Sequence, residues 1–244
     1  MAKKTRIIIT DLTRFKEGSK DVCTAGVTDD GTLIRPYPPY LQATECQRLD
    51  IHPGAILEGD LTPTNPPPPH VEDATWSNLE YVDKCSSSEF RAALRAGLFK
   101  TIAEGFEYEL PPREKCIPLS VKPPRSIITI KLPPQSFSIV GDGYNRKKIR
   151  ASFWDVSGNQ FSFVSITDRG FVDQATKIQG DRSAIADMNF HVQSQKELYL
   201  RIGLSRPHQS QDGRNGYWIQ VNGIYTFPDY LDYIRCYDDK EDQT

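Results

Sequence analysis

The chain has 244 residues, of which 38% are hydrophobic and 25% are charged, an ordinary composition for a globular protein with a sizeable core. Its formal net charge is −2, and the C-terminal DDKEDQT holds several of the acidic residues, so the rest of the chain is close to neutral. This charge balance excludes a protein that coats duplex DNA by charge alone. It does not exclude a local basic groove.

The cysteines argue against a zinc site. They are widely spaced, form no CxxC pair and lie near no histidine doublet, at Cys23, Cys46, Cys85, Cys116 and Cys236. The N-terminal MAKKTRIIIT has an apolar run too short for a signal peptide or a membrane span. We therefore expect a cytoplasmic protein with free thiols, no metal, no cofactor and no membrane association.

Strand patterns open the chain. RIIIT (6–10), VCTAGV (22–27) and TLIRPY (32–37) are short β-branched or alternating runs separated by polar turns, and each predicts a strand. TPTNPPPPH (62–70) then interrupts the pattern, because proline cannot donate a hydrogen bond inside a sheet.

One segment is plainly helical. Ser86 and Glu89 have the spacing of a capping box, apolar residues recur at every fourth position from Phe90 to Ile102, and Gly105 follows. The pattern predicts one amphipathic helix near 88–104 that packs against a sheet.

Proline pairs in the middle of the chain place a boundary at 111–125. Beyond it, SIITIKL (126–132), a hairpin over 149–167, and the runs 197–205 and 217–227 predict further strands, with a turn or bulge at 222–223 and a shorter helix near 181–188.

The inventory of elements predicts a mainly β fold of two small Greek-key barrels of the OB type. Each side of the boundary has about five short strands and a helix, which fits such a barrel. We expect an N-terminal barrel with the helix at 1–120 and a C-terminal barrel with an acidic tail at 121–244. Apolar residues at the boundary, such as Ile117, favour barrels that pack together, and an eight-stranded sandwich is the alternative.

Arg35 ends the strand in GTLIRPYPPY. Pro36 removes the next backbone donor and Tyr37 lies beside it, so the arginine is held at a rigid strand end. It either packs its stem on the tyrosines as an edge-strand charge or uses its planar fork to hold a phosphate or a carboxylate.

The segment PPPPHVED presents His70, Glu72 and Asp73 after a stiff proline run. These side chains could bind a metal or act as acid and base, but one histidine and two acids without a second histidine are a weak ligand set. The alternative is a turn in which Asp73 caps backbone N–H groups ahead of Trp76.

Two further groups are candidate binding residues. GLSRPHQSQDGRNGYWIQ repeats the Arg-Pro strand end at Arg206 and brings Trp218 to the start of the next strand, unless it is only a solvent-exposed hairpin loop. GYNRKKIR carries a basic cluster that is either a solvated face or, beside exposed aromatic side chains, a contact for single-stranded nucleic acid. The cluster consists of Arg146, Lys147, Lys148 and Arg150.

The motifs together resemble the bacterial dual OB-fold domain family. The resemblance rests on VCTAGVTDDGTLIRPY, PHVED, LRIGLSRP and GYWIQVNGIY, spread over most of 1–235. It maps a C-x-A-G motif onto Cys23, Ala25 and Gly26, and it points to Arg35, His70, Glu72, Asp73 and Arg206. Leu33 stands where the family tends to have tryptophan, which leaves an aromatic role at that position in doubt.

The resemblance implies a nucleic acid or a nucleotide as ligand and an association with prokaryotic conflict and defence systems, with a defence-system protein as a further partner. The sequence contains no GxSxG, Walker A or GxGxxG motif. We therefore expect a non-enzymatic protein that binds single-stranded nucleic acid or a nucleotide through Arg35, Tyr37, His70, Asp73, Arg206 and Trp218. The alternatives are a metal-dependent nuclease or nucleotide hydrolase using His70, Glu72 and Asp73, and a protein-interaction adaptor that uses the proline-rich 62–70 segment.

Overall fold

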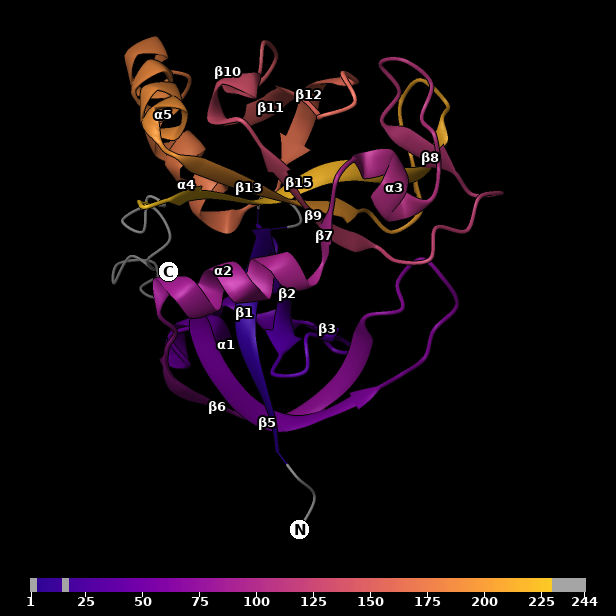
Figure 1. Cartoon of the computed structure of the whole chain (residues 1–244), viewed down its shortest axis with the longest axis vertical. Coiled ribbons are helices and arrows are strands. Elements are labelled where there is room, and N and C mark those ends of the chain that lie inside the picture. Colours follow the sequence, from indigo (N-terminus) through magenta and orange to yellow (C-terminus); the bar gives the residue numbers. More distant parts are fainter. Residues whose placement is uncertain (1–3, 15–17, 230–244) are drawn as a thin grey trace.

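The computed structural model describes residues 4–14 and 18–229, so the acidic tail and Cys236 lie outside the described residues. Two β bodies, one from each part of the chain, lie on either side of helix α2 (Ser87–Ala96) (Figure 1). None of the described helices is long and apolar enough to cross a membrane.

The first body is a closed five-stranded barrel. It consists of β1 (Thr5–Arg14), β2 (Asp21–Thr28), β3 (Leu33–Pro36), β5 (Ala55–Pro63) and β6 (Asp73–Lys84), with β4 (Leu41–Gln42) on the edge of β2 and α1 (Ala43–Arg48) after β4. Strand β1 pairs with both β2 and β5, and a parallel pairing of β3 with β6 closes the ring. A Cβ atom on Gly26 would lie 2.7 Å from the carbonyl oxygen of Ile8, so the small residue allows β1 and β2 to approach.

The second body is a larger sheet with the same core order. Its strands are β7 (Leu98–Phe99), β8 (Cys116–Pro118), β9 (Ile127–Leu132), β10 (Phe137–Gly141), β11 (Ile149–Trp154), β12 (Gln160–Ile166), β13 (Glu197–Leu204), β14 (His208–Gln209) and β15 (Asn215–Phe227). The order β10-β11-β12-β15-β13 repeats β1-β2-β3-β6-β5, including the parallel pair, here β12 with β15. The short helix η1 (Pro134–Ser136) joins β9 to β10, and β9 pairs with β13, so the first strand of this barrel is split in two. The predicted mainly β fold of two Greek-key barrels is therefore confirmed.

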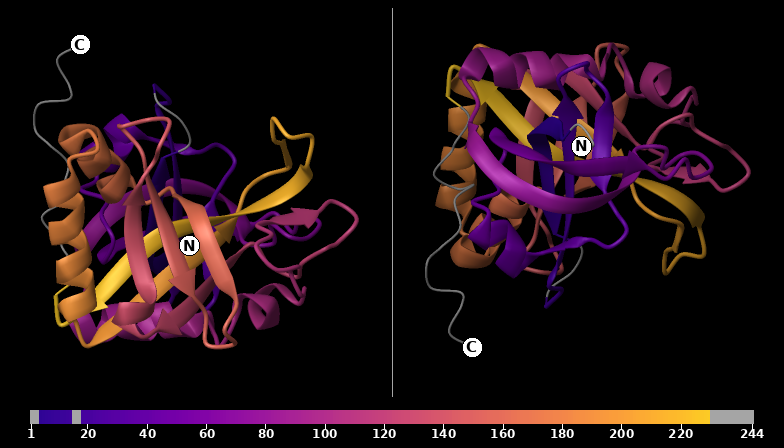
Figure 2. Two further views of the ribbon diagram at one scale, coloured as in Figure 1. Left: turned by 90° about the horizontal axis from the view of Figure 1, so that it is seen from above. Right: turned by 90° about the horizontal axis from the view of Figure 1, so that it is seen from below.

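Two helices connect β12 to β13, at the position that α1 has in the first barrel. They are α4 (Arg169–Ile178) and α5 (Arg182–Ser194). Asp181 caps the start of α5, and the helix predicted near 181–188 is longer than expected. Helix α5 flanks one side of the second barrel, while the β14–β15 hairpin extends from the opposite side (Figure 2).

The prediction of a single helix near 88–104 is wrong. The Ser86–Glu89 capping box is present, but α2 ends before Gly97, and α3 (Ile102–Phe106) begins only after β7. The carbonyl of Gly97 accepts a hydrogen bond from the Thr129 amide, and β7 pairs in parallel with β9. Pairing with a distant strand therefore replaces helical hydrogen bonds just where glycine weakens the helix.

The barrels share a core, as expected from the apolar boundary. Residues of β1, β2 and β5 contact α2 and the aromatic side chains of β13 and β15, in the cluster Ile8, Val27, Ile56, Phe90, Ala93, Leu94, Tyr199, Tyr225 and Phe227. Both β7 and β8 pair with the second sheet, and Ile102 and Ile117 belong to its core. The boundary expected at residue 120 stays a prediction, and these contacts favour an earlier division, near Gly97.

A buried ion pair crosses the contact between the barrels. Arg201 of β13 donates from Nε to Asp11 Oδ2 of β1 at 2.9 Å and from Nη1 to Thr129 Oγ1 at 2.9 Å. Both charged side chains are at most 1% exposed. Nearby, the hydroxyl of Tyr225 donates to the carbonyl of Thr10 at 2.7 Å. These contacts fix one barrel against the other.

Candidate functional site

A cleft of about 1070 Å³ lies between the two barrels. Its first wall comes from the first barrel and consists of Thr13, Arg14, Cys23, Arg35, Tyr40 and His70. Its second wall comes from β11, β12, β15 and three loops of the second barrel, and includes Lys115, Asp142, Tyr144, Lys148, Arg150, Phe163, Ser165, Ser205, Arg206, Trp218, Gln220 and Asn222. We call this space the inter-barrel cleft. It brings together residues that the sequence placed in four separate motifs.

Arg35 lies at the inner end of this cleft and uses all three of its nitrogens. The parallel pairing of β3 with β6 puts Arg35 opposite Asp73, and Nε donates to Asp73 Oδ1 at 2.6 Å. Nη1 donates to Ser126 Oγ at 3.2 Å, and Nη2 lies 3.1 Å from His70 Nδ1. The side chain is only 5% exposed. The guanidinium of Arg35 therefore holds the internal carboxylate of Asp73.

Glu72 joins the barrels rather than facing the cleft. Its Oε1 accepts from the amides of Ser126 and Ile127 at 2.7 and 3.2 Å, and its Oε2 accepts from the Ser126 hydroxyl at 2.7 Å. Among the residues that the structure describes, no three His, Cys, Asp or Glu side chains converge as metal ligands. The hydrogen-bond network around Arg35 therefore includes His70, Glu72 and Asp73. The geometry does not support a metal site formed by these three residues.

His70 is neutral in this network. Burial and the positive charges of Arg35 and Arg206 lower the pKa of His70 to about 3, and a backbone contact with Ser205 opposes this only weakly. The neutral ring accepts at Nδ1 from Arg35, which leaves the N–H on Nε2. His70 thus positions the arginine without adding charge to the cleft.

Arg206 is the exposed counterpart of Arg35. It donates to the other oxygen of Asp73, Oδ2, at 2.8 Å, but its side chain is 37% exposed. Its guanidinium lies 4.7 Å from the ring centroid of Tyr37, which in turn packs against Tyr40 with centroids 4.2 Å apart. The carboxylate of Asp73 and the ring of Tyr37 therefore hold a guanidinium that a ligand can still reach.

The opposite wall carries further cations. Arg150 pairs with Asp142 at 2.8 Å and donates to the Ser165 hydroxyl. Lys115 donates to the carbonyl oxygens of Ser162 and Phe163, and burial together with Arg150 and Arg214 lowers its pKa. The ammonium of Lys148 has no ion pair or hydrogen bond with any residue of 4–14 or 18–229, so its charge is available to a ligand.

Aromatic side chains line the same wall. Tyr144 is fully exposed and Phe163 is 60% exposed, and both border the cleft. Phe163 has φ 54°, a left-handed conformation that is costly for a bulky side chain, and it lies where the register between β11 and β12 shifts. Because strained residues concentrate at functional positions, the bulge that turns this ring toward the cleft points to a binding role.

Not every predicted residue reaches the cleft. Arg146 donates to the carbonyl of Gln179 at the end of α4, away from the cleft, and Lys147 lines a smaller pocket beside it. Tyr37 and Asp73 lie behind the cleft wall, where they support Arg206. Trp218 lines the cleft, with its Nε1 donating to the carbonyl of His208 at 2.9 Å.

The comparisons with known proteins identify the family. The model of the dual OB-containing domain matches residues 7–224, nearly the whole described chain. The chain belongs to this family. No curated protein matches it significantly. Membership of the dual OB-containing domain family indicates a binding role carried by OB folds.

The OB order explains where the cleft lies in the second barrel. OB folds bind their ligands on the face of their second and third strands and on the loops that follow the first and fourth strands. In this dual OB-containing domain, these elements are β11, β12, the loop 142–148 and the loop that begins after β13, and each contributes to the cleft. The first barrel covers the inner end of this face with Arg35 and His70.

The cleft residues that sequence reasoning missed include Arg14, Lys115, Tyr144 and Phe163. Tyr144 could have been found, because it lies inside the basic motif GYNRKKIR. Strict alternation would have put Phe163 on the same face as the buried Phe161, and only the bulge separates them.

Proposed function

We propose that the inter-barrel cleft binds single-stranded nucleic acid. The observation that carries the proposal is the combination of cations and exposed rings on the ligand-binding face of an OB barrel. Lys148 and Arg206 supply charge for phosphates, while the exposed rings of Phe163 and Tyr144 supply surfaces on which bases stack. The half-buried ring of Trp218 already carries the guanidinium of Arg214, 4.8 Å from its centroid. This pairing of a cationic groove with aromatic platforms is how OB folds hold single strands.

The size and charge of the site favour a strand over a duplex. The cleft, at about 1070 Å³, is at the upper limit of small-molecule pockets and accommodates several nucleotides. The net charge of the chain is −2, so the attraction for phosphates must come from this local cationic surface. Bases that stack on Phe163 must also be free of a complementary strand.

Binding measurements with labelled oligonucleotides test the proposal. Fluorescence anisotropy of single-stranded DNA and RNA of about 12 nucleotides should show binding that the duplex of the same length lacks. Phe163→Ala should weaken binding by about 1–3 kcal/mol, the contribution of one stacked base, and Lys148→Ala should weaken it further at low salt. Equal affinity for strand and duplex, or no binding of either, would contradict the proposal.

Two control variants match these changes in residue type. Trp154 is 49% exposed and Lys84 is exposed, and neither lines the cleft. Trp154→Ala and Lys84→Ala should therefore bind as the wild type does. If either control weakens binding as much as its partner variant, the ligand lies elsewhere on the surface.

Binding without turnover is part of the same proposal. Glu72, Asp73 and the Nδ1 atom of His70 are committed to Ser126, Arg35 and Arg206, and the remaining His70 nitrogen, Nε2, is buried. Labelled RNA, DNA and nucleoside triphosphates should remain intact during incubation with Mg²⁺ or Mn²⁺. Turnover that His70→Ala or Asp73→Ala abolishes would favour the hydrolase instead. A cytoplasmic location and a defence-system protein as partner remain predictions from the sequence.

A further inference from the structure

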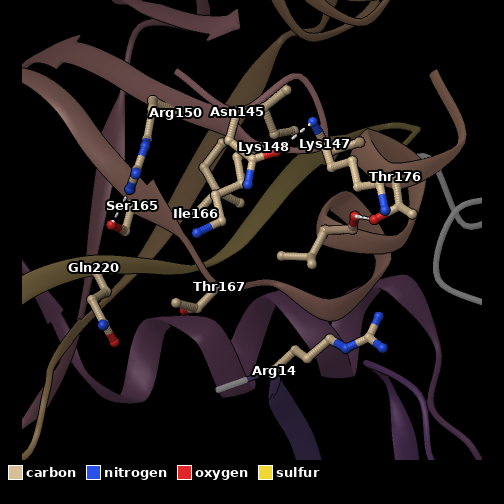
Figure 3. Close-up of a pocket in the computed structure, with 13 residues that line it drawn as sticks. Arg14, Asn145, Lys147, Lys148, Arg150, Ser165, Ile166, Thr167, Thr176 and Gln220 are labelled. Carbon is tan, nitrogen blue, oxygen red and sulfur yellow. Dashed lines mark hydrogen bonds between the residues drawn. The ribbon is translucent and has the colours of Figure 1, made fainter. Parts of the chain in front are cut away.

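A second, smaller pocket opens beside the cleft (Figure 3). Its volume is about 230 Å³, and it shares Arg14, Lys148, Arg150, Ser165, Thr167 and Gln220 with the inter-barrel cleft. Helix α4 provides its other wall through Val172, Ala175 and Thr176, none of which lines the cleft. We call this space the end pocket.

The lining of the end pocket is cationic. Arg14, Lys147, Lys148 and Arg150 border it, and among residues 4–14 and 18–229 no aspartate or glutamate does. Two acids outside the pocket neutralise part of this charge, because Asp142 pairs with Arg150 and Asp173 accepts from both Arg14 and Arg169. With the unpaired ammonium of Lys148, the pocket carries a net positive charge that a small anion would neutralise.

The shape of the pocket selects the kind of anion. Its volume is below that of pockets for drug-sized ligands. The hydroxyl of Ser165 lies beside Arg150, whereas those of Thr167 and Thr176 donate to backbone carbonyls. Because α4 forms the wall opposite the cleft, the pocket suits a group at the end of a strand better than a strand that passes through. A terminal phosphate monoester has this size, and it carries nearly twice the charge of a backbone phosphodiester at neutral pH.

We propose that the end pocket binds the terminal phosphate of a strand that lies in the inter-barrel cleft. The proposal rests on the proposed function and adds a preference for phosphorylated ends. The chain thereby distinguishes a phosphorylated strand end from a hydroxyl end. Discrimination between the two kinds of end requires α4, the second wall of the pocket. Binding of the strand itself does not require α4.

The test compares single strands of one sequence whose 5′ end or 3′ end carries either a phosphate or a hydroxyl group, with the fluorophore on the opposite end. One of the two phosphorylated ends should bind about tenfold more tightly, the gain from about one additional charge-assisted hydrogen bond. The preference should weaken below about pH 6, where the monoester loses its second charge.

A charge placed in the pocket separates this proposal from binding in the cleft. Thr176 is exposed on α4, so Thr176→Glu should fold normally and should remove the preference, weakening phosphorylated strands more than hydroxyl-ended ones. Gln174→Glu makes the same charge change on the same helix outside the pocket and should keep the preference.

Three outcomes would overturn the proposal. Equal affinity for phosphate and hydroxyl ends would refute it while the proposed function stands. A preference that persists in Thr176→Glu would place the phosphate elsewhere. A mononucleotide that displaces the phosphorylated strand at equal concentration would show that the pocket takes free nucleotides. If no strand binds at all, the proposed function itself fails.

Discussion

Replacing Arg35 by lysine should destabilise the protein substantially. Arg35 donates to Asp73, Ser126 and His70 from three different nitrogens and is 5% exposed. Lysine keeps the charge and most of the stem, but a single ammonium on a flexible chain cannot reach three partners that surround a planar fork. The variant therefore separates the geometry of the guanidinium from its charge.

The expected loss follows from the bonds that lysine cannot make. If the ammonium keeps the contact with Asp73, the bonds to Ser126 and His70 are lost, and each bond to a charged donor contributes about 1.5–3 kcal/mol. Ser126 keeps its bond to Glu72, so the loss falls at the low end, about 3–4 kcal/mol in total. For a chain of this size, the melting temperature should fall by roughly 5–15 °C.

Thermal denaturation of Arg35→Lys and Arg206→Lys measures this difference. Arg206 shares the same carboxylate but is 37% exposed, so Arg206→Lys should change stability by less than about 1 kcal/mol. Its effect should instead appear as weaker binding of single strands, because lysine cannot stack on Tyr37 in the same way. If Arg35→Lys melts with the wild type, the reasoning about its three donors is wrong.

Three further predictions concern the barrel contact, pH and salt. Arg201→Met should lower the free energy of unfolding, measured with urea, by about 3–5 kcal/mol, because Asp11 is left buried without its partner. Adding Asp11→Leu should restore part of this loss, and an unchanged stability of Arg201→Met would contradict the prediction. His70 has a folded pKa of about 3 against about 6.5 when unfolded, so the unfolded state binds its proton first and stability should fall by about 2 kcal/mol from about pH 7.5 to about pH 5. This part of the loss should be absent in His70→Gln, and an equal pH dependence in both proteins would refute it. Binding should weaken with salt with a log–log slope of about −2 if three cations of the cleft each contact a phosphate, and Lys148→Ala should reduce that slope by about 0.7.

Much of the fold could be predicted from local patterns. The hairpin of β11 and β12 has alternating strands around a polar turn, and Asn222-Gly223 marks the bulge where β15 shifts against β13. The end of α2 could not be predicted in this way. Gly97 alone costs a helix only about 1 kcal/mol, and the competing bond to Thr129 comes from a strand more than thirty residues away.

The sequence predicted which residues belong to the candidate site better than it predicted what each residue does there. Arg35 and His70 came from Arg-Pro and Pro-His patterns that fix backbone direction, and the structure brings both to one cleft with Arg206. Their mutual bonds depend on the parallel pairing of β3 with β6, which no local pattern encodes. The same holds for Asp11 and Arg201, which are 190 residues apart.

The ion pair between Asp11 and Arg201 also bears on how such a protein can change over generations. Each partner belongs to a different barrel and is almost completely buried, so replacing one alone leaves a charge without a counterpart. A barrel transplanted from another dual OB-containing domain would fold onto this one only if it brought the matching residue. Recombination between members should therefore conserve the pair as a unit, and chimaeras that divide the chain near Gly97 offer a direct way to observe this constraint.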